Sequence, residues 1–539
     1  MKIKKITAAL LAGSMVLSML AGCGTATEES TVSQGSSEET ANVSESVDST
    51  SSSDNFVSND GSIVDIEMYG LGFFGEDGLN EVMDAINAIS EKKIGVHVNY
   101  HILDIQSYTS QLPMMLISDS EKADLIMDTA ITVCGFPTLQ SQNQLMDITD
   151  YVDEYAPETK ELMKDYLPAT TVNGSIYGIP CYRVYNSSYY IVMRKDVLDA
   201  LNLTEEAQNI SSWSDYKNLL LKVQAAQDSL PENLRTNVMV SNEDAEGNVM
   251  AGWMIDLGTD DFSGNYGFET LGDSTRIVKV NDDGKVENYY ADDDYRAMCE
   301  RVADFYNSGL VYKDAATAQD SGDQEMANGV TFSYVVQSEI GVEQAKKSAT
   351  GYDVVCVPFV DVPIQTTNGN TWAWSVPQNS EEPEAAVAFM NLMYTDPDIE
   401  NLFVYGIEGR DYELNDEGEA CLLDSKVYQN SDFFFGNQFN AYPAEGTGSD
   451  FREKSLENMR SAKISPYYGC VIDTTAVANE MTALTAVKKK YEAGLASGSA
   501  DISTLDAMNS EMEGAGLQKY LDYYQEQLDK WKAEQEKNS

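Results

Sequence analysis

Residues 62–103, SIVDIEMYGLGFFGEDGLNEVMDAINAISEKKIGVHVNYHIL, predict a strand, a helix and a second strand in succession. The first strand follows from the apolar residues between Ile63 and Met68, and the second spans Ile94 to Leu103. Between them, one helical face carries the apolar residues Leu79, Val82, Met83, Ile86 and Ile89. A short apolar stretch, Ala123 to Met127, predicts a third strand. Strands that alternate with helices indicate the α/β class, with a sheet rich in parallel pairs and covered on both faces.

The turn after the first strand, Gly70-Leu71-Gly72-Phe73-Phe74-Gly75, matches the G-x-G-x-x-G pattern of dinucleotide-binding proteins. A pyrophosphate does not fit here, because Glu76 and Asp77 would repel it and the two phenylalanines would crowd it. Open α/β sheets bind ligands at the carboxyl ends of their strands. We therefore expect Phe73 and Phe74 to be ligand-binding aromatic residues in a strand-end loop.

The N-terminus has the pattern of a lipoprotein signal. Three lysines between Lys2 and Lys5 precede an apolar run from Ile6 to Leu20, which is too short for a transmembrane helix. Leu20-Ala21-Gly22-Cys23 matches the bacterial lipobox, so residues 1–22 are expected to be removed and Cys23 to be lipidated. An ordinary signal peptide with a chance cysteine is the alternative. The polar residues up to 59 predict a disordered tether.

Composition excludes several classes of function. The 88 acidic residues against 35 lysines and arginines give a net charge of -53, which argues against nucleic acid as a partner. His97 and His101 are the only histidines, so a zinc site built on histidine is not expected. Six cysteines remain after Cys23, without a Cys-x-x-Cys pair. We expect them to be free and mostly buried, although their even number permits disulfides.

Aromatic side chains point to a carbohydrate ligand. The chain contains 31 tyrosines, and a sugar ring presents an apolar face to an aromatic platform and hydroxyls to planar polar groups. For most candidates the alternative is a structural role, as core packing, an internal ion pair or a tight turn. The candidate ligand-binding residues are Phe73, Phe74, Asp128, Tyr182, Arg183, Tyr185, Trp253, Gln337, Trp372, Trp374, Glu408 and Arg410.

Four stretches in this order resemble the family 1 extracellular solute-binding proteins of ABC importers, which are of the maltose-binding-protein type. They are Gly174 to Pro180, Tyr189 to Leu198, Gly329 to Phe359 and Trp374 to Asp396. A narrower resemblance, to LplA/LipO-like binding lipoproteins, is carried by Tyr405 to Tyr412 and Phe435 to Phe439. The segment from Tyr467 onward is similar to the domain of unknown function that closes those chains.

This resemblance implies a two-lobe, periplasmic-binding-protein-like α/β fold with a hinge and a helical C-terminal extension. One lobe would comprise residues 60–179 and 326–364, and the other residues 180–325 and 365–400. Residues 401–539 would form a C-terminal region packed on the second lobe.

The resemblance also implies a function. Such proteins close on a solute, usually an oligosaccharide and in some members one that contains uronic acid, and deliver it to an ABC transporter permease. We expect a monomeric body on the extracellular face of a bacterial membrane, and a Gram-positive cell fits best. We expect no enzymatic activity and no cofactor. The sequence does not decide whether a calcium ion is bound. The alternatives are a sensor or adhesion lipoprotein, a peptide importer component and a glycoside hydrolase. Because a chain with 88 acidic residues always offers some carboxylate pair, acidic pairs alone do not favour the hydrolase. Against the hydrolase, no Gly-x-Ser-x-Gly, His-Glu-x-x-His or P-loop pattern occurs.

Overall fold

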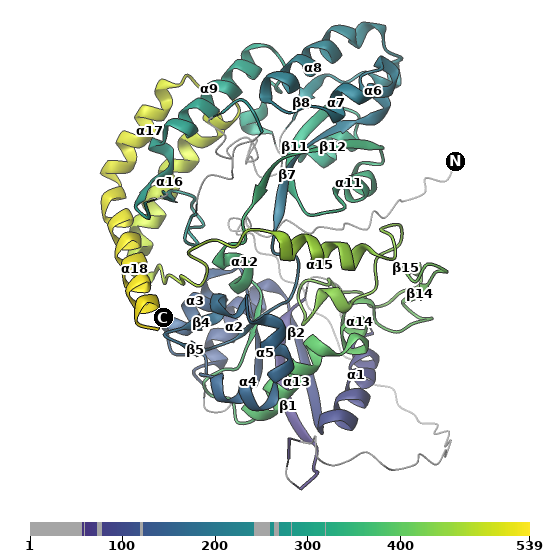
Figure 1. The fold of residues 1–539 in the computed structure, drawn as a ribbon, viewed down its shortest axis with the longest axis vertical. Helices are drawn as coiled ribbons and strands as arrows, with labels where there is room; N and C mark the ends of the chain where they lie inside the picture. The colour runs from purple at the N-terminus through teal and green to yellow at the C-terminus, as the bar shows by residue number, and fades with distance from the viewer. Residues whose placement is uncertain are drawn as a thin grey trace, which may run out of the picture.

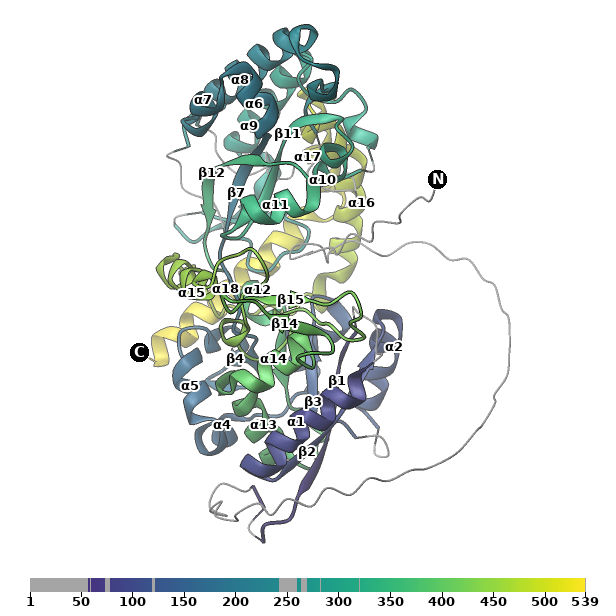
Figure 2. The same ribbon diagram turned by 90° about the vertical axis from the view of Figure 1, so that its right-hand side faces the viewer.

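The computed structural model describes residues 57–538 except residues 59, 73–77, 119–121, 242–258, 263–268, 282 and 319. The predicted signal peptide, Cys23 and residues up to 56 lie outside this range, as do Phe73, Phe74 and Trp253. Figures 1 and 2 show two α/β lobes arranged along the long axis, with chain segments that pass between them. Within the described residues, no helix combines the length and apolar character needed to span a bilayer.

Lobe 1 is built on a five-stranded sheet with the order β2-β1-β3-β13-β6. β1 is parallel to β2 and β3, whereas β13 is antiparallel to β3 and β6. The strands are β1 (Val64–Leu71), β2 (Val96–Leu103), β3 (Leu125–Asp128), β6 (Ile179–Pro180) and β13 (Ala373–Ser375). Its helices are α1 (Leu79–Ile94), α2 (Ile105–Met115), α3 (Phe136–Ser141), α4 (Thr149–Tyr155), α5 (Pro157–Met163), α13 (Pro383–Thr395) and α14 (Pro397–Tyr405), with a small hairpin of β4 (Thr171–Val172) and β5 (Ser175–Ile176).

Lobe 2 contains a four-stranded sheet with the order β12-β7-β11-β8. β7 is antiparallel to both of its neighbours, and β8 is parallel to β11. The strands are β7 (Ser187–Arg194), β8 (Val238–Val240), β11 (Thr331–Ser338) and β12 (Val354–Val362), with a separate hairpin of β9 (Val278–Val280) and β10 (Val286–Asn288). The helices are α6 (Lys195–Leu201), α7 (Thr204–Gln208), α8 (Trp213–Ala226), α9 (Asp293–Asn307), α10 (Gly322–Ala327) and α11 (Val342–Thr350).

Strand pairing corrects the predicted division of the chain. Residues 326–364 belong to lobe 2, because β11 and β12 flank β7 on its two sides, with Val336 opposite Tyr190 and Cys356 opposite Val192. Residues 365–400 contribute β13 to lobe 1, where Trp374 lies opposite Met127. The predicted assignment of these two segments was therefore wrong, since each lies in the other lobe.

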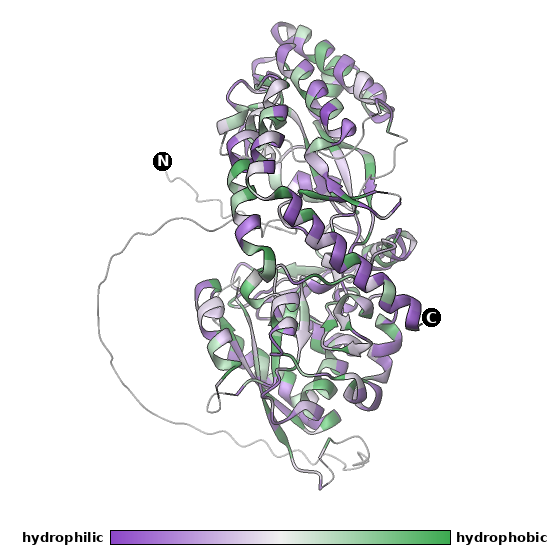
Figure 3. Cartoon of the chain, turned by 90° about the vertical axis from the view of Figure 1, so that its left-hand side faces the viewer, coloured by the Kyte–Doolittle hydropathy of each residue, from purple (hydrophilic) through white to green (hydrophobic). Residues whose placement is uncertain are grey.

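The C-terminal region is also divided between the lobes. β14 (Tyr412–Leu414), β15 (Ala420–Leu422) and α15 (Phe451–Ser461) follow α14, and Phe435 and Met459 join the lobe 1 core. The final helices α16 (Ala478–Ala496), α17 (Ser503–Gly514) and α18 (Leu517–Asn538) share the lobe 2 core through residues such as Met508. The predicted packing on lobe 2 therefore holds only for α16 to α18. The last turns of α18, beside the C-terminus, are hydrophilic (Figure 3).

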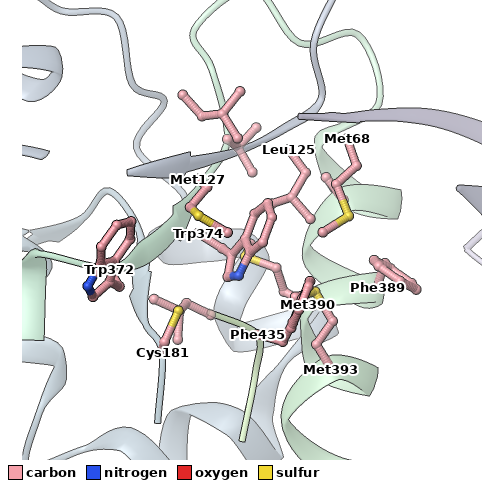
Figure 4. Close-up of a cluster of buried hydrophobic side chains, with 14 of the residues drawn as sticks. Met68, Leu125, Met127, Cys181, Trp372, Trp374, Phe389, Met390, Met393 and Phe435 are labelled. Carbon is pink, nitrogen blue, oxygen red and sulfur yellow. The ribbon is translucent and has the colours of Figure 1, made fainter. Parts of the chain in front are cut away.

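The core of lobe 1 surrounds Trp374. Its side chain has no exposed surface and lies among Met68, Leu125, Met127 and Phe435 (Figure 4). The indole Nε1–H donates a hydrogen bond of 2.9 Å to the Phe434 carbonyl, so the polar atom of this large side chain is also satisfied. Strand β13, which arrives late in the chain, thus supplies a central residue of the first lobe.

Candidate ligand-binding site between the lobes

Three segments connect the lobes, at residues 181–186, 363–372 and 462–477. The second and third run side by side (α12, Thr366–Asn370, lies within the second). The Ile364 N–H donates to the Lys463 carbonyl, and the Ser465 N–H donates to the Ile364 carbonyl, each at 2.8 Å. The Gly469 N–H donates to Thr366 Oγ1 at 3.0 Å. These hydrogen bonds join two of the crossings into one unit, which we call the paired crossing.

The carboxyl ends of strands from both sheets adjoin the crossings. In lobe 1, Asp128 at the end of β3 lies opposite Ala373, which also pairs with Pro180 at the start of the first crossing. In lobe 2, Ser338 and Val362 at the ends of β11 and β12 lie opposite Ser188 and Ser187 at the start of β7. Because ligands of open α/β sheets bind outside the carboxyl ends of strands, the boundary between the lobes is the candidate site (Figure 1).

Four predicted aromatic platforms are buried instead. Their exposed fractions are 0–5% for Tyr182, Tyr185, Trp372 and Trp374. Tyr182 packs edge-on against Phe439, and Trp372 contacts Phe434. A side chain enclosed in this way presents no face to a sugar ring, so the structure contradicts these four predictions and gives the residues packing roles in lobe 1 and at the first crossing.

Asp128 is likewise a structural residue. It has no exposed surface, and Ser375 Oγ donates a hydrogen bond of 2.5 Å to its Oδ2. Burial raises the pKa of Asp128 to about 8, although the Ser375 hydrogen bond opposes this shift. The prediction that Asp128 accepts hydrogen bonds from sugar hydroxyls is therefore wrong in this structure.

Arg183 and Gln337 lie at the crossings, as predicted for site residues. Arg183 is half-buried and donates to the Val184 carbonyl at 3.3 Å and to the Asn368 carbonyl at 3.2 Å, so it joins the first crossing to the second. Gln337, near the end of β11, accepts a hydrogen bond from the Tyr189 hydroxyl at 2.9 Å and donates one to Ser187 Oγ at 2.6 Å.

Glu408 and Arg410 lie in a tight loop beside the start of α1. Glu408 is exposed, whereas Arg410 donates to the Gly78 carbonyl at 3.3 Å and to Asp411 at 2.5–2.9 Å. Asp411 is fully buried and also accepts the Val427 N–H at 3.0 Å. Gly406, with φ of 79°, has no room for a Cβ because that atom would meet Asp411. Arg410 therefore holds the loop against lobe 1.

Sequence reasoning missed an acidic and basic cluster formed by Glu339, Asp432 and Arg452. Arg452, on α15, forms an ion pair of 2.6 Å with Asp432 and donates to the Tyr442 carbonyl at 3.1 Å. Burial raises the pKa of Glu339 to about 7; Arg183 and Arg452 oppose the shift, and Asp432 adds to it. The available sequence signal was the position of Glu339 directly after the β11 strand.

A cavity of about 370 Å³ lies in lobe 1. Its lining residues come mainly from β1 and α2, and they are Glu67, Tyr69, Gln111, Met115 and Lys122. Among the described residues, no group of three or more His, Cys, Asp or Glu side chains is arranged to hold a metal ion. The six described cysteines are free, and four of them are buried, as predicted from their surroundings.

The chain belongs to the bacterial extracellular solute-binding proteins, whose family model matches residues 84–406. A second family model, for a domain of unknown function, matches residues 466–533, which include most of α16 to α18. Both matches agree with the predicted resemblance. Proteins of this family bind solutes for ABC importers and are not enzymes, so the chain is a binding protein.

Similar proteins support this assignment. A carbohydrate ABC transporter substrate-binding protein of Streptococcus pneumoniae serotype 4 (strain ATCC BAA-334 / TIGR4) is 23% identical over 485 residues, which cover 86% of this chain and 90% of the relative. The crystal structure of the N-glycan transport solute binding protein NgtS from Streptococcus pneumoniae has a TM-score of 0.71 at 19% identity and covers 86% of this chain and 98% of NgtS. NgtS in complex with Man1GlcNAc has a TM-score of 0.59 at 21% identity, covering 86% and 99%. The two-lobe fold is thus shared.

The hydrogen bonds to the buried Asp411 carboxylate lead to a prediction about how stability depends on pH. Burial alone raises the pKa of Asp411, but hydrogen bonds from Arg410 and from the backbone N–H groups of Ile407 and Val427 hold it below its ordinary value. The carboxylate therefore stabilises the fold above the unfolded-state pKa of about 4, and this contribution is lost as the pH falls through the lower folded-state pKa. We expect Asp411→Asn to lower the free energy of unfolding at pH 7 by about 2–3 kcal/mol.

Urea unfolding of the variants from neutral to acidic pH tests this prediction. The matched control is Asp416→Asn, an exposed aspartate in the turn of the β-hairpin that follows Asp411, which should change stability by less than about 0.5 kcal/mol. Asp411→Asn should also show a weaker loss of stability on acidification than the parent chain. Equal stability of the two variants at pH 7 would contradict the role assigned to Asp411.

Proposed function

We propose that this chain captures an oligosaccharide between its lobes and delivers it to the permease of an ABC importer. The observation that carries the proposal is the meeting of strand carboxyl ends from both sheets beside the three crossings. The family supports an importer component, and the similar pneumococcal proteins support a carbohydrate cargo. We expect the body to act as a monomer.

The proposed site combines polar groups rather than one strong anchor. Gln337 lies near the end of β11, where its amide bonds Tyr189 and Ser187. Glu339 offers a carboxyl group directly after β11, and Glu408 is exposed in the loop beside the start of α1. Micromolar affinity corresponds to only about -8 kcal/mol, which a set of modest contacts supplies after the cost of closure. Closure would be a rotation of the lobes about the crossings, in which a few connecting residues absorb the backbone change.

Titration calorimetry tests the capture of oligosaccharide. The chain produced without residues 1–23 should bind at least one member of a panel of oligosaccharides, and Gln337→Ala should weaken that binding about tenfold because it removes a hydrogen-bonding amide. Gln111→Ala, which alters the separate lobe 1 cavity, is the matched control and should bind as the parent does. Binding of peptides but no glycan would contradict a carbohydrate cargo, and no binding to either would favour a sensor or adhesion protein.

We further propose that the protein is held at the outer face of the cell membrane by lipid on Cys23. The support is the Leu-Ala-Gly-Cys pattern after the apolar run and the polar tether that follows it. Two or more acyl chains give stable anchoring, whereas one gives only marginal binding. The flexible tether would let the folded body reach both its solute and its permease while the lipid stays in the membrane.

Labelling of living cells with an alkyne-bearing fatty acid tests the anchor. The parent chain should carry the label and remain in the membrane fraction, whereas Cys23→Ser should lose the label and appear in the medium or as unprocessed precursor. Cys421→Ser, a change at a partly exposed cysteine of the body, should keep the label. Label retained by Cys23→Ser would place the lipid elsewhere.

A further inference from the structure

We infer that an uncharged face of lobe 1 is the surface on which the membrane-embedded permease docks. This inference rests on the proposed function and assigns a surface to its membrane partner. The face comprises residues 105–118, which include α2, residues 129–146, which include α3, and residues 376–380. These three segments contain no Asp, Glu, Lys, Arg or His, although charged residues make up 23% of the chain.

Contacts between the three segments make the face continuous. The short helical turn η2 (Thr132–Cys134), which precedes α3, packs against α2, where Cys134 Sγ lies 3.9 Å from the Tyr108 carbonyl oxygen. Two further hydrogen bonds tie residues 376–380 to the other segments, and they run from Asn379 Nδ2 to the Met115 carbonyl at 3.1 Å and from the Met146 N–H to the Val376 carbonyl at 2.8 Å. The uncharged segments thus form one surface rather than three separate patches.

Charged residues border this face. Asp104 caps the start of α2, where its carboxylate accepts the Ser107 N–H at 3.0 Å. Near the other end of α2, Lys122 and Glu381 form an ion pair, and Glu67 lines the cavity beside the helix. The other charged residues that flank the three segments in sequence are Asp119, Glu121, Asp128 and Asp147. The face is therefore an uncharged area within a surface that is otherwise rich in carboxylates.

Large apolar side chains are exposed on this face. Gln106, Ser110 and Met114 recur every four residues, so they lie on one side of α2, and all three are exposed. Met114 is 61% exposed, Ile117 just after the helix is 75% exposed, and Val133 in η2 is 49% exposed. The centres of protein interfaces are depleted of charged residues and enriched in Met, whose flexible side chain adapts to a partner. Composition and exposure together indicate a protein-binding surface.

The face lies beside the side on which the lobes would open. Figure 2 shows α12, which belongs to the paired crossing, toward the left of the boundary between the lobes, and α2 at the right of lobe 1. A hinge opens on the side away from its crossings. Ile105 begins α2 two residues after β2 ends, and Val133 follows β3, so both adjoin the strand ends that define the candidate site. A partner docked here would meet the solute where it leaves.

Charge favours the permease over a second copy of the chain as the occupant of this face. Each copy has a net charge of -53, so two copies would repel each other at every approach. A permease lies in a membrane, where anionic headgroups repel the acidic surface of the rest of the body. An uncharged face lessens this repulsion at the point of contact, and its exposed apolar side chains gain from being buried there.

Site-specific photo-crosslinking tests the docking surface whatever the cargo is. The full-length chain is made in its own cells with p-benzoylphenylalanine in place of Met114, and cross-linked partners are identified by peptide mass spectrometry. The expected partner is an ABC importer permease, a protein with several membrane-spanning segments. The matched control position is Leu221, a leucine of α8 in lobe 2 that is 38% exposed, and it should give no such product. Cross-links at position 114 only to a second copy of the chain, or none at all, would overturn the inference.

A charge variant tests the same surface by transport. In cells whose own copy is replaced, Met114→Glu should lower the uptake of a labelled glycan at least about tenfold, because a carboxylate buried without a partner at an interface is costly. Its calorimetric affinity for that glycan should equal that of the parent, since Met114 lies outside the candidate ligand site. Leu221→Glu adds the same charge at an exposed apolar position on another helix and should keep the parent rate of uptake.

The outcomes separate this inference from the proposed function. Uptake by Met114→Glu at the parent rate, or an equal loss of uptake in Leu221→Glu, would overturn the docking surface and leave oligosaccharide capture intact. Failure of the folded parent chain to bind any glycan would overturn the proposed cargo, and the cross-link at position 114 would still decide whether this face meets a permease.

Discussion

The backbone pairing of Ile364 with Lys463 and Ser465 is the constraint on which the two-lobe arrangement depends. It joins the second and third crossings, and Ser465 Oγ adds a hydrogen bond of 2.5 Å to the buried Glu269 of lobe 2. On the other side, the Tyr468 hydroxyl donates to the Tyr166 carbonyl of lobe 1 at 3.1 Å. The same short segment thus touches both lobes before it leads into the C-terminal helices, which pack in the lobe 2 core.

The aromatic and the charged residues near the crossings have different structural roles. Tyr182, Tyr185 and Trp372 are buried and fix the shape of the first crossing and of lobe 1. Arg183 donates to the Val184 and Asn368 carbonyls and Arg452 pairs with Asp432, and these contacts stiffen the boundary.

Local pattern was enough to predict individual elements. The apolar patterns predicted β1 and β2, and the helical face between them predicted α1, with bounds within three residues of those observed. β11, β12 and β13 were assigned to the wrong lobes, because the sequence of a buried strand does not show which sheet it joins. The candidate site failed mainly at aromatic residues such as Trp374, since aromatic chemistry is the same in a core as in a sugar site. Burial, which distinguishes the two, depends on contacts between distant segments.

Small-angle X-ray scattering with and without a glycan that binds in calorimetry tests the central claim most directly. If the ligand is held between the lobes and the crossings act as a hinge, the radius of gyration should fall at saturation and the scattering should fit a closed arrangement of two unchanged lobes. An unchanged radius of gyration with the glycan bound would contradict capture by closure. It would favour a site within one lobe, such as the cavity beside Tyr69 and Gln111.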